Sequence, residues 1–224
     1  MVPIIYCTIT GADDSVDQDR LVDISLKYPF VEWGILMSKN NVGIPRYPSL
    51  EWVDGFIERC SDMCNTSCHV CGSLIDEMMN DSGVFPEWGR MQLNIGKSID
   101  EDKLLRFIEE SDIPIITQHN QHTARISCIA PSMHHHLLFD ESRGTGVPFS
   151  TVNAPIAGRF CGYAGGITPD TLETTLVAIT NVTGTKPFWI DIESGVRTND
   201  VFDIDKVVKA LEIVDGARRK IIPS

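Results

Sequence analysis

The chain has 224 residues, 42% of them hydrophobic and 22% charged, and a formal net charge of −12 at pH 7. This composition suffices for a globular core, while the acidic surface disfavours nucleic acid and anionic membranes as partners. No stretch approaches the roughly 20 apolar residues of a membrane helix, and the opening MVPIIYCTIT has neither the basic nor the long apolar region of a signal peptide. Seven cysteines, an odd number, favour a reduced, cytoplasmic protein.

Strand-like and helix-like runs alternate along the N-terminal half. Apolar, extended runs predict four strands, at 3–9, 31–37, 68–71 and 90–95. Apolar residues at helical spacing predict helices over 16–28, 50–60, 74–79 and 100–110. Ser49 and Asp100 stand at the N-cap positions of two of these helices. A longer polar loop is expected over 38–48.

The same alternation continues to the C-terminal end. Strands are predicted at 113–118, 136–140, 159–164 and 188–192, and helices over 120–130 and 204–214. Another helix is expected to begin at Pro169, capped by Thr168, because proline suits the first helical position. The glycines and prolines of 141–157 predict a loop.

Eight strands alternating with helices indicate a parallel α/β fold. A doubly wound open sheet usually has five to seven strands and a glycine-rich turn after the first one. Here the first turn reads Cys-Thr-Ile-Thr-Gly, with no GxGxxG pattern. The count of eight favours a single (β/α)8 TIM barrel, and the lack of a linker or low-complexity segment predicts one domain over 1–224.

Two glycine-containing turns follow the last two predicted strands. The first contains Gly165 and Gly166 and leads into a helix, and the second contains Ser194 and Gly195. Glycine lets backbone N–H groups approach an anion closely, and a helix N-terminus adds a favourable dipole. Phosphate sites recur in these two loops of barrels. Each turn alone is also explained by tight chain reversal, but the pair predicts a phosphate site.

Chemistry in a barrel takes place at the carboxyl ends of its strands. The first and sixth predicted strands bring Cys7 and Asp140 to this end, where they can face each other across the mouth. A thiolate can take a proton from carbon and a carboxylic acid can deliver one to oxygen, so the pair suits an isomerisation. Taken singly, each residue also fits a structural role, as a core cysteine or as a capping aspartate.

Scattered short blocks along nearly the whole chain resemble the phosphoribosylanthranilate isomerases of tryptophan biosynthesis. The blocks are Tyr6-Cys7-Thr8-Ile9-Thr10, Pro45-Arg46-Tyr47, Met91-Gln92-Leu93-Asn94, Leu137-Leu138-Phe139-Asp140, Gly144-Thr145-Gly146, Ala164-Gly165-Gly166-Ile167-Thr168-Pro169 and Asp191-Ile192-Glu193-Ser194-Gly195-Val196. Each block is short, and their order and spacing carry the resemblance.

The resemblance implies an Amadori rearrangement of a phosphorylated ribosylamine, without a metal or organic cofactor. Asp140 would be the general acid that opens the ribose ring, and Cys7 the general base that removes the C2 proton. Arg46 would meet the carboxylate of the anthranilate. The remaining implied substrate contacts are Gln92, Asn94, Gly144 and Gly146, and the implied phosphate contacts are Gly165, Gly166, Ser194 and Gly195.

Three residues depart from the family pattern. Thr8 stands in place of a glycine, Asn94 in place of a histidine, and Glu193 in place of the first serine of a phosphate turn. A carboxylate beside a phosphate is unfavourable unless it points away or pairs with a cation. Glu193 is therefore expected either to point away from the phosphate or to pair with Arg197 or Arg143, and we expect the departures to alter the substrate more than the fold.

One group of cysteines and one group of histidines contain potential metal ligands. The spacing of Cys60, Cys64, Cys68 and Cys71 differs from the paired knuckles of structural zinc sites. Histidines 119, 122 and 134–136 gather around the start of the sixth strand, away from the catalytic end of a barrel. We therefore expect free thiols and no metal.

Three functions remain open from the sequence: an isomerase of a phosphorylated sugar amine, an enzyme of different chemistry on another phosphorylated sugar or nucleotide, and a non-catalytic relative. The expected partner is a small phosphorylated substrate, with no nucleic acid and no membrane, and the expected assembly is a monomer or a homodimer.

Overall fold

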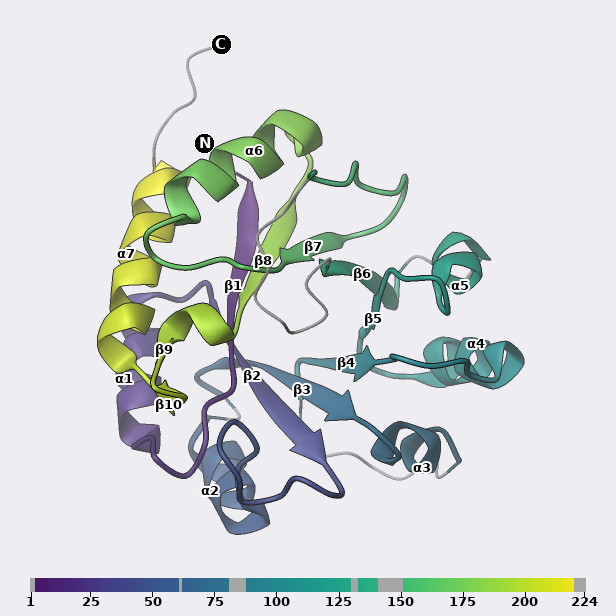
Figure 1. The fold of residues 1–224 in the computed structure, drawn as a ribbon, viewed down its shortest axis with the longest axis horizontal. Coiled ribbons are helices and arrows are strands. Elements are labelled where there is room, and N and C mark those ends of the chain that lie inside the picture. The colour runs from purple at the N-terminus through teal and green to yellow at the C-terminus, as the bar shows by residue number, and fades with distance from the viewer. Residues whose placement is uncertain (1–2, 61, 81–87, 130–132, 141–150, 220–224) are drawn as a thin grey trace.

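The computed structural model describes residues 3–60, 62–80, 88–129, 133–140 and 151–219. Eight parallel strands form a closed barrel in which β1 pairs with both β2 and β8 (Figure 1), so the predicted barrel is confirmed. The strands are β1 (Ile4–Thr10), β2 (Val31–Ser38), β3 (Asn65–Cys71), β4 (Arg90–Asn94), β5 (Ile115–Gln118), β6 (His135–Asp140), β7 (Cys161–Ala164) and β8 (Phe188–Ile192).

Helices lie around the outside of this barrel, as Figure 1 shows. They are α1 (Gln18–Lys27), α2 (Leu50–Cys60), α3 (Leu74–Asn80), α4 (Glu101–Glu110), α5 (Ala124–Ile129), α6 (Leu172–Thr183) and α7 (Ile204–Arg219). A short 3-10 helix, η1 (Ser194–Val196), and the hairpin of β9 (Arg197–Thr198) and β10 (Val201–Phe202) connect β8 to α7. Between β6 and β7, the described residues 151–160 contain no helix.

The predicted helix caps explain where some helices begin. Ser49 Oγ accepts the N–H of Trp52 at 3.2 Å, and Asp100 accepts the N–H of Lys103 at 3.0 Å, as expected. Thr168 Oγ1 accepts the N–H of Thr171 at 3.3 Å, but the helix itself begins only at Leu172. The prediction of Pro169 as its first residue was therefore wrong by one turn. β3 begins at Asn65, three residues before the predicted strand.

Successive residues of each strand face opposite sides of the barrel wall, and two separate cores result. The outer core lies between the strands and the helices, and contains Cys7, Ile9 and Trp33 together with helix residues such as Leu21 and Leu211. The inner core lies inside the barrel and is formed by Ile116, Leu138, Ala164, Trp189, Tyr6 and Phe160.

The inside of the barrel also holds a buried ion pair. Arg90 on β4 donates to Glu32 on β2 from Nε at 2.7 Å and from Nη2 at 2.5 Å, and both side chains are at most 4% exposed. Thr8 Oγ1 donates to the same carboxylate at 2.7 Å. The Arg90 guanidinium lies over the rings of Tyr6 and Trp189, so the inner core closes around a charged but fully paired group.

Candidate active site

A cavity of about 620 Å³ opens where the strands of the barrel end, within the size range of small-molecule sites. Because the strands are parallel, their carboxyl ends meet at one end of the barrel, and most strands contribute a side chain to the wall. The lining includes Leu36, Cys71, Asn94, Gln118, Asp140, Ala164 and Ile192 from the strand ends, and Arg46 and Tyr47 from the β2–α2 loop. The fold therefore places the cavity at the end predicted to carry the chemistry.

The two glycine-containing turns predicted from the sequence meet in this cavity. Gly165, Gly166, Ser194 and Gly195 all line it. Gly165 and Gly166 have φ of 117° and 61°, in the region that favours glycine. Gly195 packs on the other turn so closely that a Cβ would lie 1.9 Å from the carbonyl oxygen of Ile167. A side chain at 195 is therefore excluded, and the turns form one continuous wall.

Two aspartates, Asp140 at the end of β6 and Asp191 on β8, line the same cavity. Gln118 Nε2 donates to Asp140 Oδ2 at 3.4 Å, and Thr10 Oγ1 donates to Asp191 Oδ1 at 2.6 Å. Burial is the largest cause that raises the pKa of Asp191, to about 8, assisted by the negative charges of Glu193 and Asp140 and opposed by the Thr10 hydrogen bond. Asp191 therefore carries a proton at neutral pH.

Cys7 does not face Asp140, and the expectation that the two meet across the mouth was wrong. Tyr6 and Thr8 point into the barrel, as their contacts with Arg90 and Glu32 show, so Cys7 between them points outward. Its side chain is 0% exposed in the outer core. Burial raises the pKa of the Cys7 thiol well above its ordinary value, so it stays protonated away from the cavity.

The floor of the cavity, on the side of β3 and β4, is polar. Gln92 Nε2 donates to Asn94 Oδ1 at 2.9 Å, and Asn94 Nδ2 donates to Cys71 Sγ at 3.1 Å. Gln92 Oε1 and His69 Nε2 are buried with no hydrogen-bond partner in the structure. Burial lowers the pKa of His69 to about 4, so its ring is neutral. Such groups suit the hydroxyls of a sugar.

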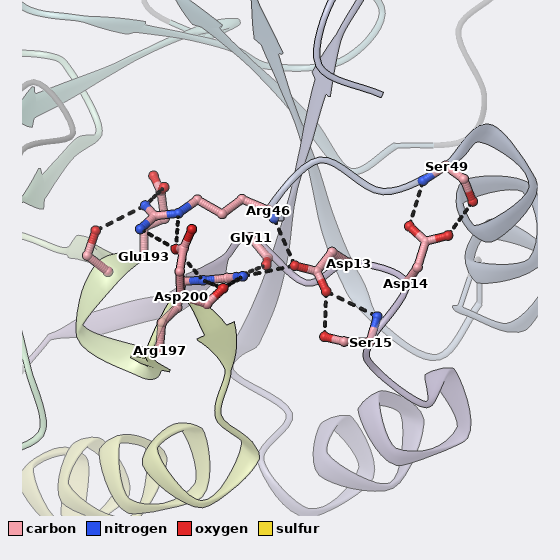
Figure 2. A network of polar contacts seen from close by, with 10 residues as sticks. Gly11, Asp13, Asp14, Ser15, Arg46, Ser49, Glu193, Arg197 and Asp200 are labelled. Atoms are coloured by element: carbon pink, nitrogen blue, oxygen red, sulfur yellow. Dashed lines mark hydrogen bonds and ion pairs between the residues drawn. The ribbon is translucent and has the colours of Figure 1, made fainter. Parts of the chain in front are cut away.

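Arg46 reaches across the mouth of the cavity to the loop after β8 (Figure 2). Its Nη1 donates to Glu193 Oε1 at 2.6 Å and to Ser194 Oγ at 3.2 Å. Its Nε and Nη2 lie 2.8 and 2.7 Å from the same oxygen, Oδ1 of Asp200. Glu193 therefore pairs with Arg46, whereas Arg197 pairs with Asp13.

A second arginine, Arg197, binds the loop after β1 that positions Arg46. Arg197 donates from Nη2 to Asp13 Oδ2 at 2.9 Å and from Nη1 to the carbonyl oxygen of Gly11 at 2.5 Å. The same Asp13 oxygen accepts the backbone N–H of Arg46 at 2.8 Å, which fixes Arg46 at a φ of 76°. Figure 2 shows these contacts, which join the loops after β1, β2 and β8 into one network.

Some predicted residues are not brought into the site. Gly144, Gly146 and Arg143 lie outside the described residues. The four cysteines weighed as zinc ligands do not converge, because Cys68 packs in the outer core while Cys71 lines the cavity. In the part of the chain that the structure describes, no three His, Cys, Asp or Glu side chains are grouped as metal ligands, and no helix is long and apolar enough to cross a membrane.

One side chain of the site, His69, was not predicted from the sequence. Cys71 and Asp191 were expected at the catalytic ends of their strands, but no chemical role was predicted for either. Asp191 was the most detectable of them, because an acidic residue in the apolar strand Phe188–Ile192 is exceptional in a buried strand. His69 has no such signal, because β3 also contains Asn65, Thr66 and Ser67.

The family model described as N-(5'phosphoribosyl)anthranilate (PRA) isomerase matches residues 90–213. The phosphoribosylanthranilate isomerase of Thermotoga maritima has a similar fold, with a TM-score of 0.62, 15% identity and coverage of 96% of this chain and all of that one. The Pyrococcus furiosus enzyme has a TM-score of 0.58, also at 15% identity, with coverage of 95% of this chain and 99% of its own. No curated protein sequence shows a significant match.

Proposed function

The chain belongs to the PRA isomerase family, and we propose that it rearranges a phosphorylated ribosylamine into a 1-amino-1-deoxyketose phosphate, with Asp140 and Asp191 as its proton-transfer groups. One observation carries the proposal: a single cavity combines the carboxyl groups of Asp140 and Asp191 with the paired glycine turns. Carboxyl groups of different proton affinity can supply both the acid and the base of an isomerisation.

In this proposal the phosphate lies against the turns at Gly166 and Ser194. Backbone N–H groups and a serine hydroxyl can bind a phosphate without a lysine or arginine, which suits a wall whose nearby cation is already paired. The sugar then extends toward β3 and β4, where Gln92, Asn94 and His69 offer polar atoms to its hydroxyls. The partner of the site is accordingly a small phosphorylated substrate.

Gly195→Ala tests the phosphate end. The added methyl would clash with the Ile167 carbonyl oxygen, so the two turns must separate. We expect the dissociation constant of inorganic phosphate, measured by isothermal titration calorimetry, to rise by about tenfold or more, because one lost hydrogen bond to a charged group accounts for that factor.

Gly216→Ala is the matched control, because Gly216 lies in α7 with no heavy atom near the added methyl. This variant is expected to bind phosphate as the unmodified chain does, with a slightly raised stability. Unchanged phosphate affinity in a folded Gly195→Ala variant would place the phosphate elsewhere.

The proton transfers balance without any other group. Protonated Asp191 donates to the ribose ring oxygen as the C1–O bond breaks, which leaves an iminium cation between C1 and the amine nitrogen. Asp140 removes the C2 proton, and the electrons of that C–H bond neutralise the iminium to give an enolamine. The proton on Asp140 returns to C1 while the enol hydroxyl reprotonates Asp191, so the product is an isomer of the substrate.

Turnover and its pH dependence test this mechanism. The purified chain is expected to convert N-(5'-phosphoribosyl)anthranilate or N-(5'-phosphoribosyl)aniline to the ketose. Chromatography of the product measures this conversion. Because Asp191 must be protonated to donate, kcat/KM is expected to fall as the pH rises past about 8. Thr10→Val removes the hydrogen bond that favours the ionised form, so this descending limb should move up by about one pH unit.

A descending limb that stays in place in Thr10→Val would show that Asp191 is not the titrating acid. If neither compound yields a ketose product, the proposed reaction itself is contradicted.

A further inference from the structure

Arg46 is the one Lys or Arg side chain among the described residues that line the cavity, and all three of its guanidinium nitrogens have partners. Nη1 is bonded to Glu193 and Ser194, while Nε and Nη2 both meet Asp200. A carboxylate is bound strongly by an arginine through two parallel N–H donors. Both edges that could form such a pair are occupied by acidic side chains of the protein.

The charges around Arg46, like its hydrogen bonds, disfavour a ligand carboxylate. Glu193 and Asp200 together carry two negative charges against the single positive charge of Arg46. The side chains of Arg46 and Glu193 are 26% and 30% exposed, so solvent screens this pair only in part. A ligand carboxylate entering here has to displace a carboxylate that is already bonded, and it then lies beside the one it has displaced.

The position of Arg46 is also fixed from its backbone. Asp13 accepts the Arg46 N–H, and Asp13 is itself held by Arg197 and by Ser15. Because the backbone at Arg46 cannot easily follow a ligand, the guanidinium stays within reach of Glu193. Glu193 is likewise fixed, at the start of η1 and beside the packed turn at Gly195.

We propose that Glu193 is a specificity-determining residue, which closes Arg46 to ligand carboxylates and selects phosphorylated ribosylamines whose N-substituent carries no carboxylate. This inference rests on the proposed function for the identity of the sugar phosphate, and it concerns the carboxylate of the N-substituent. It places the discrimination in one ion pair of the mouth, separate from the two aspartates that transfer protons.

A pair of non-reactive ligands tests the inference by binding alone. The two are 1-phenylamino-1-deoxyribitol 5-phosphate and the same compound with an ortho-carboxylate on the ring, and neither has a carbonyl group to isomerise. The unmodified chain is expected to bind the carboxylate-free ligand about tenfold more tightly in isothermal titration calorimetry. Glu193→Gln is expected to tighten binding of the carboxylate ligand about tenfold and to leave the other ligand within about twofold.

Glu193→Ser provides a second variant, because a glutamine amide can still accept a hydrogen bond from Arg46 and serine is too short to do so. Glu109→Gln is the charge-matched control, since Glu109 is exposed near the C-terminal end of α4, at the other end of the barrel. This control is expected to leave the ratio of the two dissociation constants unchanged. High salt should narrow the ratio in the unmodified chain.

The inference is overturned if the unmodified chain prefers the carboxylate ligand, if both Glu193 variants change the two affinities equally, or if neither ligand binds. Its failure is distinct from failure of the proposed function. If the chain shows the expected ratio of dissociation constants but forms no ketose product, the inference stands and the proposed reaction is contradicted. If it forms ketose product without that ratio, the proposed reaction stands and the inference is contradicted.

Discussion

Asp191→Asn and Asp140→Asn are each expected to lower kcat/KM about 10²- to 10⁴-fold, the range for loss of a general acid or base. Cys7→Ala is expected to leave kcat/KM within about threefold, because its thiol lies in the outer core and not in the cavity. The measurement is steady-state kinetics of the ketose-forming reaction at pH 7, where Asp191 holds its proton.

The matched comparison is between position 7 and position 191, which lie on neighbouring strands. Cys7 pairs with Ile190 across β1 and β8, so the residue next to Ile190 faces the cavity while Cys7 faces the helices. Thermal unfolding of each variant separates a chemical effect from a loss of folded protein. A Cys7→Ala variant that is folded and inactive would assign the general base to the thiol and remove Asp140 from that role.

Arg90→Met is expected to lower the free energy of unfolding by about 3–5 kcal/mol, the range for removing one partner of a buried ion pair. Glu32 would remain 2% exposed inside the barrel with only the Thr8 hydroxyl among its present partners. Urea denaturation followed by tryptophan fluorescence measures the change. The guanidinium also contacts Tyr6 and Trp189, and methionine keeps part of that packing.

The double variant Glu32→Leu with Arg90→Met is expected to recover most of this loss, because no uncompensated charge is then buried. Arg125→Met is the surface control, since its pairing with Glu101 is largely exposed and is expected to contribute less than about 1 kcal/mol. If the double variant is no more stable than Arg90→Met alone, the loss comes from packing and not from the stranded charge.

The barrel and its two glycine-containing turns were predictable because they depend on local signals. Eight strand-like runs alternate with seven helix-like runs, and the glycines at 165, 166 and 195 mark turns whatever the surrounding structure. The side of β1 that faces the inside of the barrel was predicted wrongly. From Cys7 to Thr10 its residues are buried on both sides, so the burial pattern there has no alternation, and the block around Cys7 suggested an inward thiol. The polar residues Thr8 and Thr10 share the other face and were the available signal.

The ion pairs of the mouth lay beyond sequence reasoning for another reason. Glu193 and Arg46 are 147 positions apart, and Asp13 and Arg197 are 184 apart. Only closure of the barrel brings the loops after β1, β2 and β8 together, so the choice of Arg46 over Arg197 as the partner of Glu193 is decided by tertiary structure. The same holds for the proton affinity of Asp191, which depends on burial and on neighbours from other strands.

The buried carboxyl group of Asp191 has a consequence for the whole fold. Its pKa is about 8 in the folded protein and 3.8 in an ordinary solvated aspartate, so over this interval the native chain retains a proton that the unfolded chain releases. Stability from this group is fully present below pH 4, declines by roughly 1.4 kcal/mol per pH unit, and is lost as the pH rises through 8. Across this interval the fold therefore gains stability from the Asp191 carboxyl group as the pH falls toward 4.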